Sequence, residues 1–228
     1  MAKKIATSVT HLVIDMPIGA TTKIDNLQQA KEIKRKFQYI AKKYGMKLEV
    51  IITKDPDPVG KGVGPALEAR DVLRVLQQKD NRPVDLENKS IRLAGRLLEL
   101  CGKAGKGHGE AMACKQLKSG LAWGKMSEII KAQGGKANVD SEEVTLGAIK
   151  HYVTADRNGR IRLTDNKRVN DICRILGAPG DKLGGIYLNK EIGDHVKAGE
   201  RLFTLYARNE TRMSLAKEAI KKLKIFEY

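Results

Sequence analysis

The stretch that decides the fold is residues 55–71, DPDPVGKGVGPALEARD, in which Gly60, Gly62 and Gly64 alternate with other residues. The apolar run Leu48–Ile52 precedes this stretch and predicts a buried strand, whereas the residues after it predict a helix. Glycines at a turn from strand to helix allow the backbone to approach a ligand or an ion closely. The stretch therefore predicts an α/β fold.

The spacing of the glycines excludes two phosphate-binding motifs. No Gly-Lys-Ser or Gly-Lys-Thr closes the turn, so it is not a Walker P-loop. The third glycine comes one position too early for the dinucleotide-binding fingerprint. Two interpretations remain open: a purely structural turn, or a turn whose exposed amides or carbonyls contact an ion or a phosphate.

The residues before the turn predict a strand, a helix and a second strand. The runs His11–Asp15 and Lys47–Thr53 are apolar enough for buried strands. Between them, the apolar residues of Asp25–Tyr44 fall on one face of a helix, and Asp25 and Gln28 have the spacing of a capping-box variant. After the turn, apolar residues at helical spacing predict helices near residues 69–76, 91–101 and 112–130.

The pattern changes from about residue 145. Short β-prone runs at residues 149–153, 160–163 and 201–206 surround a predicted helix that Gly177 ends. Residues 193–205 have the pattern of a hairpin in a barrel-like scaffold, and residues 210–224 predict a basic amphipathic helix. We therefore expect two domains, an α/β domain over residues 1–140 and a small α+β domain over residues 145–228.

The composition favours anionic partners. Lysine and arginine number 43 against 27 acidic residues, a formal charge of +16. Aromatic residues are only 4% of the chain, which argues against a base-stacking surface, although the final helix leaves a basic nucleic-acid-binding module open as an alternative. Three scattered cysteines fit a reducing, cytoplasmic compartment, and no apolar run approaches the roughly 18 residues of a membrane span.

Cys101, His108 and Cys114 do not predict a metal site. Their spacing matches no common zinc pattern, and no fourth ligand is evident. We expect the two cysteines to be buried and the histidine to be exposed.

Several segments together resemble the thymidine and pyrimidine nucleoside phosphorylase family. Residues 1–6, MAKKIA, resemble the S-I-x-A-K-K helix of the family, and residues 55–70 resemble its glycine-rich Q-P-L-G element. Residues 155–159, 183–186 and 193–196 resemble its C-terminal domain. The segment after the first predicted strand contains Pro17, and in this it resembles the archaeal branch of the family, which acts on AMP.

This resemblance implies a fold and an activity. The fold would be a truncated nucleoside-phosphorylase α/β domain followed by a small α+β domain with barrel-like, hammerhead character. The intact enzyme, a pentosyltransferase and homo-oligomer, would use phosphate as co-substrate to cleave AMP or another nucleoside 5′-monophosphate into free base and ribose 1,5-bisphosphate. It would need no organic cofactor. A thymidine or pyrimidine nucleoside phosphorylase is the alternative within the family.

The resemblance also implies site residues. Lys3 matches the lysine that contacts the substrate, and Val59, Gly62 and Asp71 match positions that hold a monovalent cation such as K⁺. Backbone carbonyls would serve at the first two and a carboxylate at Asp71, where the family commonly has glutamate. The phosphate-binding loop and the catalytic residues would lie upstream of Met1. We therefore expect the chain to be a piece of a longer protein and to be inactive alone.

Overall fold

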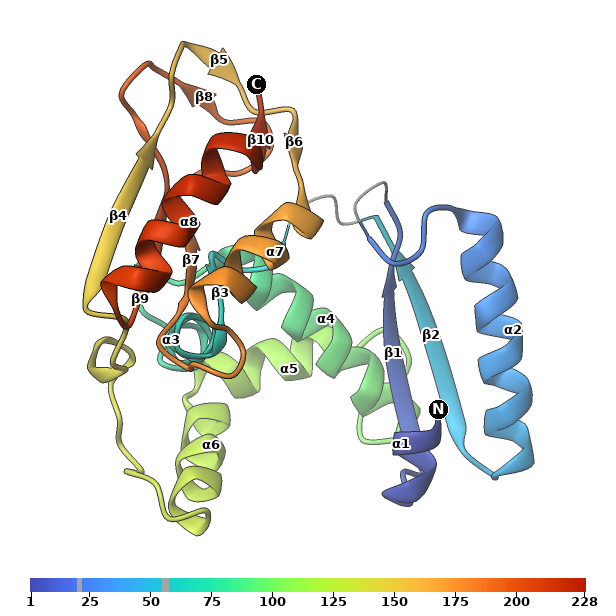
Figure 1. Ribbon diagram of the computed structural model, residues 1–228. Helices are drawn as coiled ribbons and strands as arrows, with labels where there is room; N and C mark the ends of the chain where they lie inside the picture. The colour runs from blue at the N-terminus through green and yellow to red at the C-terminus, as the bar shows by residue number, and fades with distance from the viewer. Residues whose placement is uncertain (20–21, 55–57) are drawn as a thin grey trace. The chain divides into compact units, whose positions relative to one another are not determined.

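The computed structural model describes residues 1–19, 22–54 and 58–228 (Figure 1). The chain forms two compact units. Unit 1 comprises residues 1–55 and 87–122, and unit 2 comprises residues 56–86 and 123–228. Residues 55–57, the start of the glycine-rich stretch, lie outside the described residues. In the described ranges, no helix combines the length and the apolar character needed to cross a membrane.

Unit 1 contains a β–α–β arrangement, as the sequence predicts. Its first elements are α1 (Ala2–Ala6), β1 (His11–Pro17), α2 (Leu27–Lys43) and β2 (Lys47–Thr53). The two strands are parallel and pair from His11 with Lys47 to Pro17 with Thr53. Helix α2 lies along this pair (Figure 1), and Met16, Ala30 and Val50 form a buried cluster between them. Burial of one helix face against the strands is what stabilises such a unit.

The N-terminal cap of α2 lies one residue later than predicted. The Asn26 side chain accepts a hydrogen bond from the backbone N–H of Gln29 at 2.9 Å. The Gln29 side chain in turn accepts one from the backbone N–H of Asp25 at 3.0 Å. The predicted pair of Asp25 and Gln28 is therefore wrong, because Asn26 accepts the orphan N–H equally well one position closer to the apolar run.

Three more helices follow α3 (Pro65–Leu76) in the middle of the chain. They are α4 (Val84–Leu100), α5 (Gly109–Lys118) and α6 (Leu121–Ala132), so the region predicted near residues 112–130 is two helices. In unit 1, α4 and α5 meet at two glycines. A Cβ atom on Gly109 would lie 2.1 Å from the carbonyl oxygen of Gly95, so only glycine allows this approach.

Unit 2 is built on a four-stranded antiparallel sheet. Its strands, in the order β3, β7, β9 and β4, are Gly62–Val63, Gly185–Leu188, Arg201–Ala207 and Ile149–Thr154. The helices of this unit include α3 (Pro65–Leu76), α7 (Asn166–Leu176) and α8 (Glu210–Lys222), and residues 141–143 form the 3₁₀ helix η1 (Ser141–Glu143). Its core includes Ile172, Leu176, Ile186, Leu205 and Met213, all fully buried.

The described strands do not show the expected barrel-like character. The four-stranded sheet is open, with β3 and β4 at its edges. Two short pairs lie outside it, β5 (Gly159–Arg160) with β8 (His195–Val196) and β6 (Leu163–Thr164) with β10 (Phe226–Glu227). The predicted hairpin at residues 193–205 is not formed by adjacent strands, because β8 pairs with β5 while β9 pairs with β7 and β4.

The two units do not follow the order of the chain. Residues 56–86 group with the C-terminal residues, because β3 pairs with β7 and the backbone N–H of Ala66 donates to the carbonyl of Lys182 at 3.1 Å. A two-residue strand has no periodicity by which a sequence could predict this pairing. The expected domains, 1–140 and 145–228, remain a prediction that is distinct from these units.

Candidate functional site

Carboxylates hold the glycine-rich turn in unit 2. Asp71, in α3, is only 2% exposed. Its Oδ2 atom accepts hydrogen bonds from the backbone N–H groups of Gly62 at 2.7 Å and Lys61 at 2.8 Å. The side chain of Asp85 accepts a third from the backbone N–H of Gly60 at 2.7 Å. These bonds satisfy three N–H groups that the turn would otherwise leave without partners.

Two of the three glycines are required by close packing. A Cβ atom on Gly62 would lie 2.6 Å from the carbonyl oxygen of Leu67. Gly64 has a φ of +119°, and a Cβ atom there would lie 2.5 Å from the carbonyl oxygen of Gly184. Both contacts are with the backbone, which cannot move aside as a flexible side chain can. These contacts support the structural interpretation of the turn.

Arg74 connects Asp71 to Glu142, which lies in η1. Its Nε and Nη2 atoms donate to Oε1 of Glu142 at 2.9 and 2.7 Å, and its Nη1 atom lies 3.6 Å from Oδ1 of Asp71. Arg70 donates to the carbonyls of Glu142 at 3.2 Å and Val144 at 2.9 Å. Helix α3 is thereby tied to η1 by charge-assisted bonds.

The ionisation of this network follows from burial and from its partners. Burial raises the pKa of Asp71 above its usual value, against the opposing hydrogen bonds from Gly62 and Lys61. Burial also disfavours the charge of Arg74, but the hydrogen bond and the charge of Glu142 outweigh it and raise the pKa of that guanidinium. The pKa of Glu142 is lowered, because Arg74 outweighs the effect of its partial burial.

The predicted cation ligands come together in part. Gly62 and Asp71 are in direct contact, and Val59 is half-buried at the start of the same turn. The Oδ1 atom of Asp71 is buried and accepts no hydrogen bond from the described residues, as an oxygen reserved for a cation would. Arg74 already places a positive charge 3.6 Å from that atom, so a bound cation would share this oxygen with a guanidinium.

The predicted substrate-binding lysine belongs to the other unit. Lys3 is exposed on α1. Its carbonyl accepts a hydrogen bond from the hydroxyl of Thr7 at 3.0 Å, which satisfies one backbone group at the end of this short helix. No interaction tests the side chain of Lys3 in the described residues, and the role of this residue stays a prediction.

The described residues include no group of three or more His, Cys, Asp or Glu side chains arranged for a metal ion. The exposure predicted for His108 is confirmed. The burial predicted for the two cysteines is wrong, since Cys101 is exposed and Cys114 is only partly buried. Cys101 directly follows the last residue of α4, where the chain turns out to solvent.

One polar cluster was not predicted from the sequence. At the carboxyl ends of β1 and β2, the Thr53 hydroxyl donates to Oδ1 of Asp15 at 2.9 Å, and the Lys89 ammonium lies 2.6 Å from Oδ2 of the same carboxylate. Ligands of parallel sheets commonly bind at this edge. The signal in the sequence was an acidic residue directly after the apolar run Leu12–Ile14.

Comparison with known proteins identifies the family of this chain. Residues 161–226 match the pyrimidine nucleoside phosphorylase C-terminal domain. The chain is 41% identical over 216 residues to the AMP phosphorylase of Thermococcus kodakarensis, which covers 95% of the chain and 43% of that relative. It is 40% identical to the AMP phosphorylase of Pyrococcus furiosus, with the same two coverages. The chain belongs to the nucleoside phosphorylase family that comprises AMP phosphorylases and thymidine phosphorylases.

Bacterial relatives are equally similar. The putative thymidine phosphorylase of Ralstonia nicotianae is 39% identical over 208 residues, which are 91% of the chain and 40% of that relative. The predicted family is therefore confirmed, whereas these identities do not separate the archaeal branch from the bacterial one. The chain spans about 43% of the length of the first of these relatives.

Proposed function

We propose that the chain is part of a phosphorylase that cleaves the N-glycosidic bond of a nucleoside 5′-monophosphate with phosphate. The observation that carries this proposal is the similarity to AMP phosphorylases along 95% of the chain. AMP is the substrate we favour, and the products are adenine and ribose 1,5-bisphosphate. The working enzyme is a homo-oligomer in the cytoplasm and uses no organic cofactor.

In this reaction an oxygen of phosphate forms a bond to C1′ of the ribose while the bond from C1′ to the base breaks. The base leaves with the electron pair and takes up a proton. Catalysis then depends on holding phosphate against C1′ and on stabilising the charge that grows on the base. Lys3 is exposed on a helix of its own, so its ammonium can reach a substrate and supply positive charge there.

In this proposal the glycine-rich turn of unit 2 holds a monovalent cation. Asp71 fixes the backbone of Lys61 and Gly62 through its Oδ2 atom and keeps its Oδ1 atom for a monovalent cation. The carbonyls of Val59 and Gly62 complete the part of the cation site that this chain supplies, and oxygen ligands suit such an ion.

A second candidate is a thymidine phosphorylase. The observation that favours it is the 39% identity to a putative thymidine phosphorylase, which is close to the 41% identity to an AMP phosphorylase. The two candidates differ in one chemical feature, since AMP carries a 5′-phosphate and thymidine does not.

The test is an assay of phosphate-dependent release of adenine from AMP and of thymine from thymidine. We would compare the complete product of the gene, the 228-residue chain alone, and the Lys3→Met and Lys4→Met variants of the complete product. We expect the complete product to prefer AMP and the chain alone to be inactive. Lys3→Met should lower kcat/KM by about 100-fold or more, as loss of an electrostatic contact to the reacting groups does.

Lys4→Met is the matched control, because Lys4 is exposed on the same helix and should leave the rate within about threefold. A preference for thymidine would favour the second candidate. No phosphate-dependent release from either compound would contradict both.

The cation has a separate readout. If Val59, Gly62 and Asp71 hold K⁺ in the complete product, its melting temperature should be higher in potassium chloride than in choline chloride at equal ionic strength. Asp71→Asn should remove this difference, because the neutral amide attracts the ion less. Equal melting temperatures in the two salts would count against the cation site and leave the phosphorylase proposal standing.

A further inference from the structure

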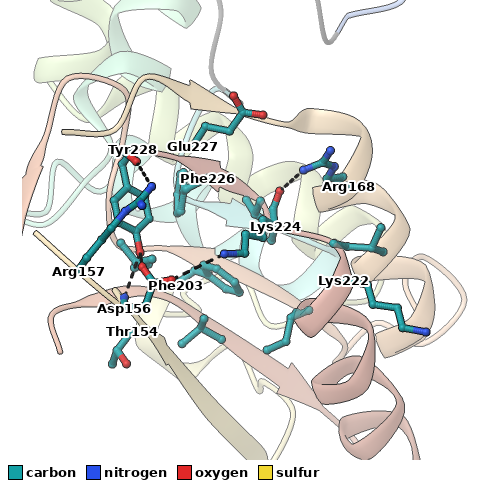
Figure 2. Close-up of a pocket in the computed structure, with 15 residues that line it drawn as sticks. Thr154, Asp156, Arg157, Arg168, Phe203, Lys222, Lys224, Phe226, Glu227 and Tyr228 are labelled. Atoms are coloured by element: carbon teal, nitrogen blue, oxygen red, sulfur yellow. Dashed lines mark hydrogen bonds and ion pairs between the residues drawn. The ribbon is translucent and has the colours of Figure 1, made fainter. Parts of the chain in front are cut away.

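A cavity lies in unit 2. It has a volume of about 510 Å³ and lies between the end of β4, the start of β9, the last turn of α8 and β10 (Figure 2). Small-molecule sites typically have volumes of about 300–1,000 Å³. None of the predicted residues Lys3, Val59, Gly62 and Asp71 lines it, so the proposed function does not explain it.

The charges around this cavity favour an anion. Arg157, Arg168, Lys222 and Lys224 contribute four positive side chains to its lining, against the two carboxylates of Asp156 and Glu227. The Oδ1 atom of Asp156 accepts a hydrogen bond from the Tyr228 hydroxyl at 2.7 Å. Positive charge in a partly enclosed space attracts anionic ligands.

One of these cations is fixed in position. The Nε atom of Arg168 lies 3.0 Å from Oδ2 of Asp165, and its Nη1 atom donates to the carbonyl of Lys224 at 2.7 Å. These two contacts hold the guanidinium and use only part of its five N–H donors. A ligand that binds here therefore loses little free energy in ordering this side chain.

A second cation is weakly paired. Figure 2 shows Lys224 between Arg168 and Asp156. Its ammonium lies 3.7 Å from Oδ2 of Asp156, and both side chains are more than half exposed. A pair at this distance and exposure is weak, so an anion of higher charge can take the place of the carboxylate.

The wall beside these cations is apolar. The rings of Phe203 and Phe226 lie 6.0 Å apart with their planes at 58°, and the half-buried side chains of Ile220 and Leu223 lie in the same lining. The guanidinium of Arg157 lies over the ring of Tyr228 at 5.7 Å. The cavity thus combines an anion-binding side with a hydrophobic and aromatic side.

We propose that this cavity binds a phosphate monoester with an aromatic or apolar body, which is the chemistry of a nucleoside monophosphate. The phosphate would contact Arg168 and Lys224, since charge-assisted bonds from these groups suit phosphate oxygens. The body would lie against the apolar wall next to Phe226. The proposed site is built from residues of unit 2 alone.

The test is calorimetric titration of the 228-residue chain with AMP, adenosine, ribose 5-phosphate and inorganic phosphate, at low and high ionic strength. AMP should bind saturably and more weakly at high salt. Adenosine and inorganic phosphate should each bind at least about tenfold more weakly, because each lacks one half of the recognised chemistry. Ribose 5-phosphate carries the phosphate ester but has no base. If it bound as tightly as AMP, the proposed contact between the base and the apolar wall would be wrong.

Two variants locate the bound ligand. Lys224→Met should weaken AMP binding about three- to tenfold. Lys221→Met is the matched control, because Lys221 is equally exposed, at 67% against 69%, and is also paired with an acidic residue, Glu218. Its affinity should stay within about twofold of the wild type. Circular dichroism would confirm that both variants are folded.

Three results would overturn the proposal: no saturable binding of AMP, equal effects of the two variants, or loss of binding in Lys3→Met but not in Lys224→Met. The last would place the nucleotide at the predicted substrate-binding residue. Because the readout is binding to this chain and not turnover, a failure of the proposed phosphorolysis leaves the test intact.

Discussion

The carboxylate of Asp71 accepts a hydrogen bond from the backbone N–H of Gly62 at 2.7 Å, nine residues earlier in the chain. The same oxygen accepts a second bond from Lys61. The acidic residue therefore shapes the turn whether or not it also binds an ion. The shape of this glycine-rich turn therefore depends on a side chain of the helix that follows it.

Removal of the Asp71 side chain should destabilise unit 2. Asp71→Ala leaves the buried N–H group of Gly62 and the partly buried one of Lys61 without their acceptor, so the free energy of unfolding should fall by about 3 kcal/mol. Asp71→Asn keeps one acceptor oxygen and should cost only about 1 kcal/mol. Urea unfolding of both variants measures the difference. Equal losses in the two would show that the acceptor oxygen is not what holds the turn.

Substitution of Gly64 should be far more harmful than substitution of an unconstrained glycine. Gly64→Ala brings a Cβ atom to 2.5 Å from the carbonyl oxygen of Gly184 at a φ of +119°, so we expect a loss of about 2–4 kcal/mol. Gly124, within α6, has nothing within 4 Å of a new Cβ atom. Gly124→Ala should therefore stabilise the chain by about 0.5–1 kcal/mol. Chemical unfolding of the two variants tests the contrast, and a harmless Gly64→Ala would contradict the backbone contact.

The bond between Arg74 and Glu142 should make stability depend on pH. The pKa of Glu142 in the folded chain lies below its ordinary value of 4.5, because the stabilisation by Arg74 outweighs its partial burial. A carboxyl group with a lowered pKa contributes stability that is present above pH 4.5 and is lost as the pH falls through the folded value. The melting temperature of the wild type should therefore exceed that of Glu142→Gln near neutral pH. The difference should shrink as the pH falls below 4.5.

The size of this effect is limited by solvent. Glu142 is 53% exposed, so we expect a difference of about 1 kcal/mol near neutral pH. Glu143→Gln is the matched control in the same 3₁₀ helix, since Glu143 pairs only with the exposed Lys136 in the described residues. It should stay within about 0.5 kcal/mol of the wild type. A Glu142→Gln difference that grows as the pH falls would reverse the sign and refute this assignment.

The cysteines should differ in reactivity. Burial raises the pKa of Cys173 to about 12, and its Sγ atom lies 3.6 Å from the carbonyl oxygen of Val63. Since the thiolate is the reactive form, iodoacetamide near pH 8 should leave Cys173 unmodified in the folded chain. Cys101 is exposed and should be alkylated under the same conditions. Mass spectrometry of the peptides, with a denatured sample as control, tests this, and early labelling of Cys173 would show that the core of unit 2 opens.

The strongly periodic elements could be predicted from the sequence. The strand at Lys47–Thr53 has the predicted bounds, and α2 lies within the predicted Asp25–Tyr44. Both bury one regular face, which leaves a clear apolar pattern. The cap of α2 was misplaced by one residue because Asp25 and Asn26 are both good acceptors, and the choice between them depends on the local backbone.

The pairing of short strands could not be predicted. β5, β8 and β10 have two residues each, too few for a pattern, and their partners lie tens of residues away in the chain. The hairpin expected at residues 193–205 failed for this reason. Local sequence indicates where the chain can turn, but the partner of each strand is chosen by burial in the assembled unit.

The sequence by itself determined the family, the β–α–β order of the first unit and the position of the glycine-rich turn. These depend on local pattern and on motif order, both of which can be read along one chain. Only the tertiary structure decided that Asp71 anchors the turn, that Arg74 faces its free oxygen, and that Arg168 and Lys224 border an apolar cavity. Each of these features depends on side chains that folding brings together, and their ionisation and contacts follow from that shared, partly buried environment.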